Sequence, residues 1–156
     1  QYTRGIEDLD EVIRLDPQNA IAYYHRGIAY SAREQYQQAI KDLDEAIRLD
    51  PQNAFAFYNR GIAYGRLKQY QWAIENLDQA IKLNPQNAFA FYNRGIAYVA
   101  LEQYQRAIED LDQAIKIDPR NPFAYYNRGV AYEKLGKPKK AQLDLQKAME
   151  LGYETP

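Results

Sequence analysis

The sequence predicts an all-α protein built as an array of antiparallel helix pairs, and three observations lead to this fold class. Prolines recur every 34 residues, at Pro17, Pro51, Pro85 and Pro119, and glycine, tyrosine and alanine columns keep the same step. Within each unit, apolar residues recur at the spacing of one helix face. Asparagines stand where helices would begin, and prolines stand where they would end. A fixed period of this length is typical of repeat architectures, in which each unit contacts only its neighbours.

The period divides the chain into one half repeat and four full units. The half repeat covers residues 1–19, and the units cover 20–53, 54–87, 88–121 and 122–156. The opening segment QYTRGIEDLDEVIRLDPQ aligns with QYQQAIKDLDEAIRLDPQ, the second half of a unit. The last unit is atypical, because Pro138 and Gln142 replace a recurring tyrosine and isoleucine. A terminal unit that turns polar is how repeat arrays are capped.

The first helix of each unit has two apolar stripes. An asparagine precedes it and suits an N-cap, at Asn19, Asn53, Asn87 and Asn121. Pro122 stands at the first helical position, where its missing N–H costs nothing. In the second unit, one face comprises Ala56, Phe57, Gly61, Ala63, Tyr64 and Leu67. The second stripe comprises Phe55, Tyr58, Asn59 and Ile62. We expect this helix to be the inner one, with its second stripe lining a groove.

The second helix of each unit has a single apolar stripe. It begins after a break near residues 68–71, runs to about Leu83 and is stopped by Pro85. Its stripe comprises Ala73, Leu77, Ala80 and Ile81. The opposite face carries Glu75, Asn76, Gln79 and Lys82. This pattern predicts an outer, half-solvated helix.

The composition excludes several classes of function. The 20 basic and 21 acidic residues nearly cancel, so no net field holds nucleic acid or an anionic membrane. No apolar run approaches the length of a membrane-spanning helix, so we expect no membrane insertion. The first residues also lack a basic-then-apolar signal region. The chain contains no cysteine, which excludes disulfides and thiolate metal sites and fits the reducing cytoplasm.

The sequence also lacks the residues that an enzyme needs. His25 is the only histidine, so a Ser/His/Asp set and a histidine metal site have little to draw on. Carboxylates are numerous, but they fall on predicted outer helices and form no acid/base pair. No glycine-rich phosphate loop is present. We therefore expect neither catalysis, nor a cofactor, nor a metal.

With these columns in place, the chain resembles the tetratricopeptide repeat family, whose pattern is Trp-x2-Leu-Gly-x2-Tyr followed by Ala-x3-Phe, Ala and Pro. The second unit supplies Phe57-x2-Arg60-Gly61-x2-Tyr64, then Ala73-x3-Leu77, Ala80 and Pro85. The resemblance covers the whole chain. It implies a right-handed superhelical α-solenoid whose concave side holds partner proteins or peptides, with no catalysis by the repeats.

One column departs from the family pattern. The leucine before the glycine is replaced by arginine, at Arg26, Arg60, Arg94 and Arg128. In one interpretation each arginine braces its helix pair against a second-helix acid, among them Asp42, Asp44, Asp78 and Asp110. In the other interpretation the arginines reach a carboxylate or phosphate of a ligand. The fixed fork of guanidinium donors suits either role.

The columns expected to line the groove supply the candidate binding residues. They are Tyr24, His25, Phe55, Tyr58, Asn59, Ile62, Phe89, Tyr92, Asn93, Ile96, Phe123, Tyr126 and Asn127. Aromatic rings offer large contact areas, and side-chain amides can hydrogen-bond a peptide backbone. The alternative is that these rings only pack against neighbouring helices. We expect His25 to be a solvated groove residue.

Two resemblances within the family bear on the ligand. Chaperone-binding members grip a C-terminal carboxylate with lysines, asparagines and an arginine. The corresponding positions here are Tyr24, Ile28, Asn59, Phe89 and Asn93, and only Asn59 matches, which argues against such a clamp. The recurring asparagine resembles instead the asparagine ladder of O-GlcNAc transferases, which holds peptide main chain.

Three functions remain open on the sequence. The preferred one is a protein-interaction module that holds an extended or helical partner segment in the groove. The second is a self-assembly or spacer element, because residues 1–15 lack a partner helix and bare ends can associate with another copy. The third is a regulatory segment of a larger enzyme, of which this chain would be a piece. Trp72, on the predicted outer helix, is either a second contact patch or simple packing.

Overall fold

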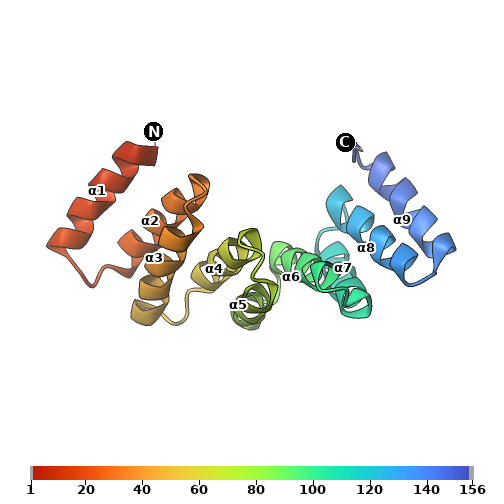
Figure 1. Cartoon of the computed structure of the whole chain (residues 1–156), viewed down its shortest axis with the longest axis horizontal. Coiled ribbons are helices and arrows are strands. Elements are labelled where there is room, and N and C mark those ends of the chain that lie inside the picture. Colours follow the sequence, from red (N-terminus) through yellow and green to blue (C-terminus); the bar gives the residue numbers. More distant parts are fainter. Residues whose placement is uncertain (1, 155–156) are drawn as a thin grey trace. The chain divides into compact units, whose positions relative to one another are not determined.

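The computed structural model describes residues 2–154, which form α-helices and no strand (Figure 1). Residue 1 of the half repeat and residues 155–156 of the last predicted unit lie outside this part. The chain divides into two compact units that are larger than the 34-residue repeats. Unit 1 is residues 1–84 and unit 2 is residues 85–156, and from here on the 34-residue segments are called repeats. Unit 1 contains α1 (Tyr2–Leu15), α2 (Ala20–Ala32), α3 (Tyr36–Leu49), α4 (Ala54–Arg66) and α5 (Tyr70–Leu83). Unit 2 contains α6 (Ala88–Ala100), α7 (Tyr104–Ile117), α8 (Pro122–Lys134) and α9 (Pro138–Glu150). The predicted all-α fold class is confirmed.

The first helix of every pair begins at an asparagine, as predicted. The Asn53 side-chain oxygen accepts a hydrogen bond from the Ala56 backbone N–H at 3.0 Å, and Asn19 does the same for Ala22. In unit 2 the asparagines before α6 and α8 cap their helices in the same way. Each bond satisfies one of the backbone donors that a helix start leaves without an internal partner.

The turn inside each helix pair places one residue in the left-handed region. The residue is Glu34, Lys68, Glu102 or Gly136, with φ of 59°, 59°, 58° and 68°. The break predicted near residues 68–71 is confirmed, since α4 ends at Arg66 and α5 begins at Tyr70. Only glycine adopts this conformation without a steric cost. Three of the four turns therefore carry a small strain.

We expect Lys68→Gly to raise the free energy of unfolding of unit 1 by about 0.5–1 kcal/mol, because it removes that steric cost. Urea denaturation followed by circular dichroism measures the change. The converse substitution, Gly136→Lys, is the matched control and should destabilise unit 2 by a similar amount. A loss of stability in the Lys68 variant would contradict the strain argument.

Each unit is held together by alanine and leucine side chains where its helices cross. In unit 1, α2 pairs with α3 and α4 with α5, while α3 packs on α4 and α1 on α2. Its core includes the fully buried Leu43, Ala46 and Ala56, at the α3–α4 contact. In unit 2, α6 pairs with α7 and α8 with α9, and Leu111 and Ala124 form the corresponding contact between α7 and α8.

The second helices bury the predicted stripe, with one correction. Ala73, Leu77 and Ala80 are buried in α5 as expected. Asn76 was predicted to be solvated, and this is wrong: only 5% of the residue is exposed. It lies against α4, where its side-chain oxygen accepts a hydrogen bond from Arg60. Among the residues that the structure describes, no helix has the length and apolar character needed to span a bilayer.

Candidate protein-interaction surface

In unit 1 the predicted binding residues lie on the first helices, α2 and α4. Phe55 is 58% exposed and Ile21 is 68% exposed, although both are large apolar residues. His25 is exposed and its ring meets that of Tyr24 edge-on at 5.2 Å. The remaining members are half-buried: Tyr24, Tyr58, Asn59 and Ile62. We call the set Ile21, Tyr24, His25, Phe55, Tyr58, Asn59 and Ile62 the aromatic strip of unit 1.

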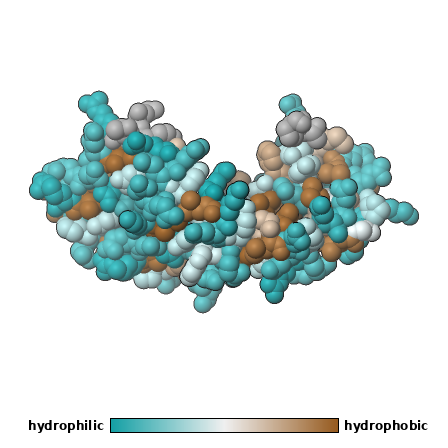
Figure 2. All heavy atoms as spheres, in the orientation of Figure 1, coloured by the Kyte–Doolittle hydropathy of each residue, from teal (hydrophilic) through white to brown (hydrophobic). Residues whose placement is uncertain are grey.

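Unit 2 carries an equivalent strip on α6 and α8. Phe89 and Phe123 are 58% and 54% exposed. The half-buried members are Tyr92, Asn93, Ile96, Tyr126 and Asn127. These seven residues form the aromatic strip of unit 2. The alternative that the phenylalanines only pack against neighbouring helices does not fit rings that are more than half exposed. On the face drawn in Figure 2, apolar residues (brown) form separate patches among hydrophilic ones.

The asparagines of the strips use their amide donors inside the protein. Asn59 Nδ2 donates to the Phe55 carbonyl at 2.8 Å and to the Tyr24 hydroxyl at 3.3 Å. In unit 2, Asn127 Nδ2 makes the same two bonds, to the Phe123 carbonyl and the Tyr92 hydroxyl. A backbone carbonyl only accepts hydrogen bonds, so it determines which end of the amide faces it. The amide oxygen of Asn59 and of Asn127 therefore points away from that carbonyl.

The tyrosines of the strips supply the complementary donor. Burial raises the pKa of Tyr24 and of Tyr92 above the usual value of a phenol, and the asparagine bond opposes this only in part. Both hydroxyl groups therefore stay protonated at neutral pH. Since each oxygen accepts from an asparagine, its O–H proton can serve a second acceptor. Along each strip, the O–H donor of a tyrosine thus alternates with the amide oxygen acceptor of an asparagine. These bonds between successive repeats were not foreseen from the sequence.

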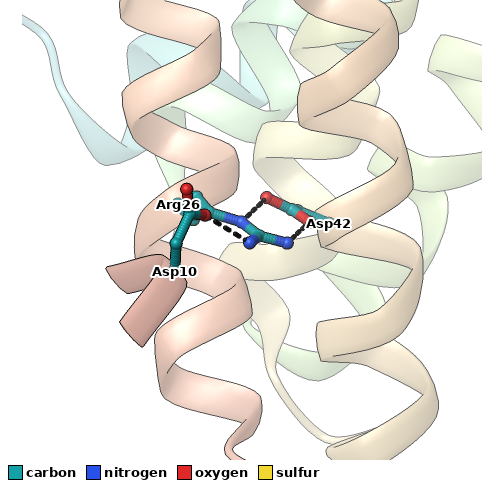
Figure 3. Close-up of polar contacts among 3 residues, drawn as sticks. All are labelled: Asp10, Arg26 and Asp42. Carbon is teal, nitrogen blue, oxygen red and sulfur yellow. Dashed lines mark hydrogen bonds and ion pairs between the residues drawn. The ribbon is translucent and has the colours of Figure 1, made fainter. Parts of the chain in front are cut away.

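The arginine column braces the helices, as one interpretation predicted. In Figure 3, Arg26 grips Asp42 on α3 through two bonds of 2.7 Å, and its third contact reaches Asp10 on α1 at 2.6 Å. The Asp42 bond is the main factor that raises the pKa of the Arg26 guanidinium above its usual value. In unit 2, Arg128 repeats the arrangement, with two bonds to Asp144 and one to Asp112.

The other two arginines complete the pattern. Arg94 binds Asp110 through two bonds of 2.7 and 2.6 Å. Arg60 binds Asn76 and Asp44, each at 2.6 Å, so the second repeat has an amide where the others have a carboxylate. Each guanidinium also lies over the ring that replaces the family's tryptophan, as Arg60 does over Phe57 at 5.4 Å. These bonds give the arginine column a structural role, since each guanidinium joins two helices.

Trp72 lies outside the strips, on α5. Its ring stacks on Tyr64 of α4 at 6.1 Å and it remains 57% exposed. It borders a cavity of about 430 Å³ whose lining includes Arg60 and Glu75. In unit 2 the corresponding positions hold cations, and Arg106 lies over Tyr98 at 5.8 Å. Trp72 therefore combines packing on its own repeat with a large exposed area.

Tyr153, which follows α9, was not among the predicted binding residues. Its ring stacks on Tyr126 at 4.2 Å and meets Phe123 edge-on at 5.6 Å, so it lies on the strip of unit 2. The only signal in the sequence is a glycine after a helix, followed by an aromatic residue. Gly152, at φ 93°, adopts the left-handed conformation that ends helices, but this does not reveal where the next side chain packs.

Helix pairs stacked through small residues, with exposed rings repeated at equivalent positions, define a repeat scaffold for protein interactions. Comparison with protein families agrees. A family model described as TPR repeat matches residues 29–68 and 95–136, more than half of the chain. Two models described as tetratricopeptide repeat match residues 54–87 with 122–151, and residues 9–41 with 76–109. The chain belongs to the tetratricopeptide repeat family, whose repeats are in general non-enzymatic scaffolds.

Solved structures with the same fold include proteins named MamA and YrrB. A crystal structure of MamA is 32% identical, with a TM-score of 0.90, covering 94% of this chain and 85% of that one. MamA from Desulfovibrio magneticus RS-1 is 28% identical, with a TM-score of 0.91, covering 96% and 85%. YrrB, described as a TPR protein with an unusual peptide-binding site, is 28% identical, with a TM-score of 0.86, covering 97% and 78%. No curated protein matches the sequence.

Proposed function

We propose that the aromatic strips line apolar concave grooves that hold an extended or helical segment of a partner protein. The observation that carries the proposal is the exposure of Phe55, Phe89 and Phe123, each more than half, beside asparagines whose donors are already used. Exposed rings at three equivalent positions are costly to leave in water and favour a partner that covers them. YrrB, which has the same fold, is described as having a peptide-binding site.

The polar groups of the strips suit a peptide backbone. An extended peptide presents N–H donors and C=O acceptors in alternation. The Asn59 oxygen would accept from the former, and the Tyr24 hydroxyl would donate to the latter. The rings would supply contact area without favouring a positively or negatively charged peptide. Such a site binds at roughly micromolar strength, because the ordering of the peptide offsets much of the buried area.

The test is to replace Asn59 and Asn93 by alanine together. Partners are first captured from a lysate on the immobilised wild-type protein and identified by mass spectrometry. The dissociation constant of a captured peptide is then measured by fluorescence anisotropy. We expect the double variant to bind about 5- to 10-fold more weakly, because whichever strip holds the peptide loses a backbone hydrogen bond.

Two controls make this result interpretable. Circular dichroism must show that the double variant stays helical, since Asn59 also bonds to Tyr24 and Phe55. Trp72→Ala removes an exposed ring away from the strips and should leave the affinity unchanged. If the captured peptide binds the asparagine variant as tightly as the wild type, the groove proposal fails.

A second candidate function is self-association, which the apolar surface of α9 favours. Leu143 and Met149 are 68% and 59% exposed, and Met149 borders a cavity of about 610 Å³ with Pro138 and Leu145. Met149 occupies the position of Ile47 and Ile115, which pack against the contacts between successive repeats. A second copy could cover this surface by two-fold pairing. Sedimentation over a concentration series tests the idea, and a monomer at every concentration rules it out.

A further inference from the structure

Tyr153 is an aromatic side chain that the protein itself places on the strip of unit 2. After α9 ends at Glu150, the Tyr153 N–H donates to the Ala148 carbonyl at 2.9 Å, and this bond anchors the residue beside the helix. Its ring then lies nearly parallel to that of Tyr126, with an interplanar angle of 16° and a centroid distance of 4.2 Å. The Phe123 ring stands almost perpendicular to it, at 82° and 5.6 Å.

These two contacts have the geometries that aromatic rings prefer, a stack and an edge-to-face contact. Tyr126 and Phe123 form a corner, and the single ring of Tyr153 contacts both of them at once. The occupation is incomplete, because Phe123 is still 54% exposed. Asn127 donates to the Phe123 carbonyl at 2.8 Å and to the Tyr92 hydroxyl at 3.3 Å, so this corner is continuous with the hydroxyl and amide groups of the strip.

We propose that Tyr126 and Phe123 form a slot for one aromatic side chain of a bound peptide, and that Tyr153 occupies this slot until such a peptide displaces it. The inference rests on the proposed function and adds to it the chemistry of the partner: an extended segment with a tyrosine or phenylalanine. A flat ring fits because a branched aliphatic side chain cannot stack on Tyr126 and meet Phe123 edge-on at the same time.

An internal occupant lowers the apparent affinity for an external one. The apparent dissociation constant is the intrinsic one divided by the fraction of molecules whose slot is open. With a stack and an edge contact of ordinary strength, Tyr153 fills the slot in most molecules. The slot is then open in roughly a tenth to a fifth of them. Removing the Tyr153 ring should therefore tighten binding about 5- to 10-fold.

The experiment titrates the whole chain with p-cresol, which is the tyrosine side chain alone, and follows the rings of Tyr126 and Phe123 by NMR. We expect Tyr153→Ala to bind p-cresol at roughly millimolar strength and the wild type to bind it about 5- to 10-fold more weakly. Tyr153→Phe is the control that keeps the ring and loses only the hydroxyl contact with Tyr126, so it should bind p-cresol more weakly than Tyr153→Ala does. The saturated analogue 4-methylcyclohexanol should bind the Tyr153→Ala variant more weakly than p-cresol does.

Each outcome decides one part of the proposal. No p-cresol binding to Tyr153→Ala, or equal binding of the saturated analogue, would overturn the aromatic slot. Equal p-cresol affinity in the wild type and Tyr153→Ala would overturn the role of Tyr153 as occupant. The asparagine double variant tests the groove separately. If partner binding depends on Asn59 and Asn93 while p-cresol does not bind, the slot fails and the proposed function stands. If p-cresol binds while partner binding does not depend on the asparagines, the groove proposal fails and the slot stands.

Discussion

Replacing Leu77 by alanine is expected to lower the free energy of unfolding of unit 1 by about 2–5 kcal/mol. Leu77 is 1% exposed, and it lies on α5 against Gly61 of α4. A Cβ atom placed on Gly61 would lie 2.9 Å from Leu77 Cγ and 3.2 Å from the Ala73 carbonyl oxygen. The truncation therefore leaves a cavity beside backbone that cannot collapse freely. Urea denaturation measures the loss, and amide hydrogen exchange in α4 and α5 localises it.

The same contact can be tested from its other side. Gly61→Ala is expected to destabilise unit 1 by about 1–3 kcal/mol, because the added methyl group collides with Leu77. In the double variant Gly61→Ala, Leu77→Ala, the methyl group enters space that the leucine has vacated. The combined loss should then be smaller than the sum of the two single losses.

Gly5 provides the matched control for this pair. It lies within α1, and a Cβ atom there would meet no other group within 4 Å. Gly5→Ala should therefore stabilise the protein by about 0.5–1 kcal/mol through helix propensity alone. If Gly61→Ala were stabilising as well, or if the two single losses were strictly additive, close helix packing at Gly61 would not be the cause.

Asp42→Ala is the second substitution with a large expected effect, a loss of about 3 kcal/mol from unit 1. Asp42 is 6% exposed and accepts two charged hydrogen bonds from Arg26. Its removal leaves a largely buried guanidinium with only the Asp10 carboxylate, which is itself half exposed. The charge of Arg26 then lacks its main partner in a region of low dielectric. The measurement is again urea denaturation, repeated at two salt concentrations.

The protein contains its own precedent for a milder change at this position. Asn76 is the equivalent of Asp42 in the second repeat, and it binds Arg60 through its amide oxygen. Asp42→Asn should therefore cost about 1 kcal/mol, well below the alanine variant. An asparagine variant as unstable as the alanine variant would show that the carboxylate charge, and not the hydrogen bond, stabilises the pair. High salt should weaken the outer Asp10 contact more than the inner one.

Much of the fold could be predicted because its signals are local. An asparagine cap, a proline stop and apolar residues at helical spacing act within one turn or one helix. The α4 and α5 boundaries and the caps before α2, α4, α6 and α8 follow from such signals. Repetition then shows which positions are equivalent, so the arginine column could be paired with second-helix acids before any contact was known.

Other features depend on contacts between residues distant in sequence. Asn76 is polar and was therefore expected to be solvated, yet it faces α4 beside Gly61 and accepts a hydrogen bond from Arg60. The asparagines of the strips were expected to hydrogen-bond a peptide backbone, but bonds to residues 4 and 35 positions away use both N–H groups of Asn59 and Asn127. Which donors remain is decided only when successive first helices lie side by side.

The sequence by itself determined the class of this protein: helix pairs, their boundaries and the columns of rings, tyrosines and asparagines on the first helices. The tertiary structure decided which of those groups are exposed and which already have hydrogen-bond partners. It exposed the phenylalanines, occupied the amide donors and placed Tyr153 on Tyr126. The reason is physical. Helix formation is governed by neighbours within a few residues, whereas exposure and hydrogen-bond availability depend on all surfaces that fold against a side chain.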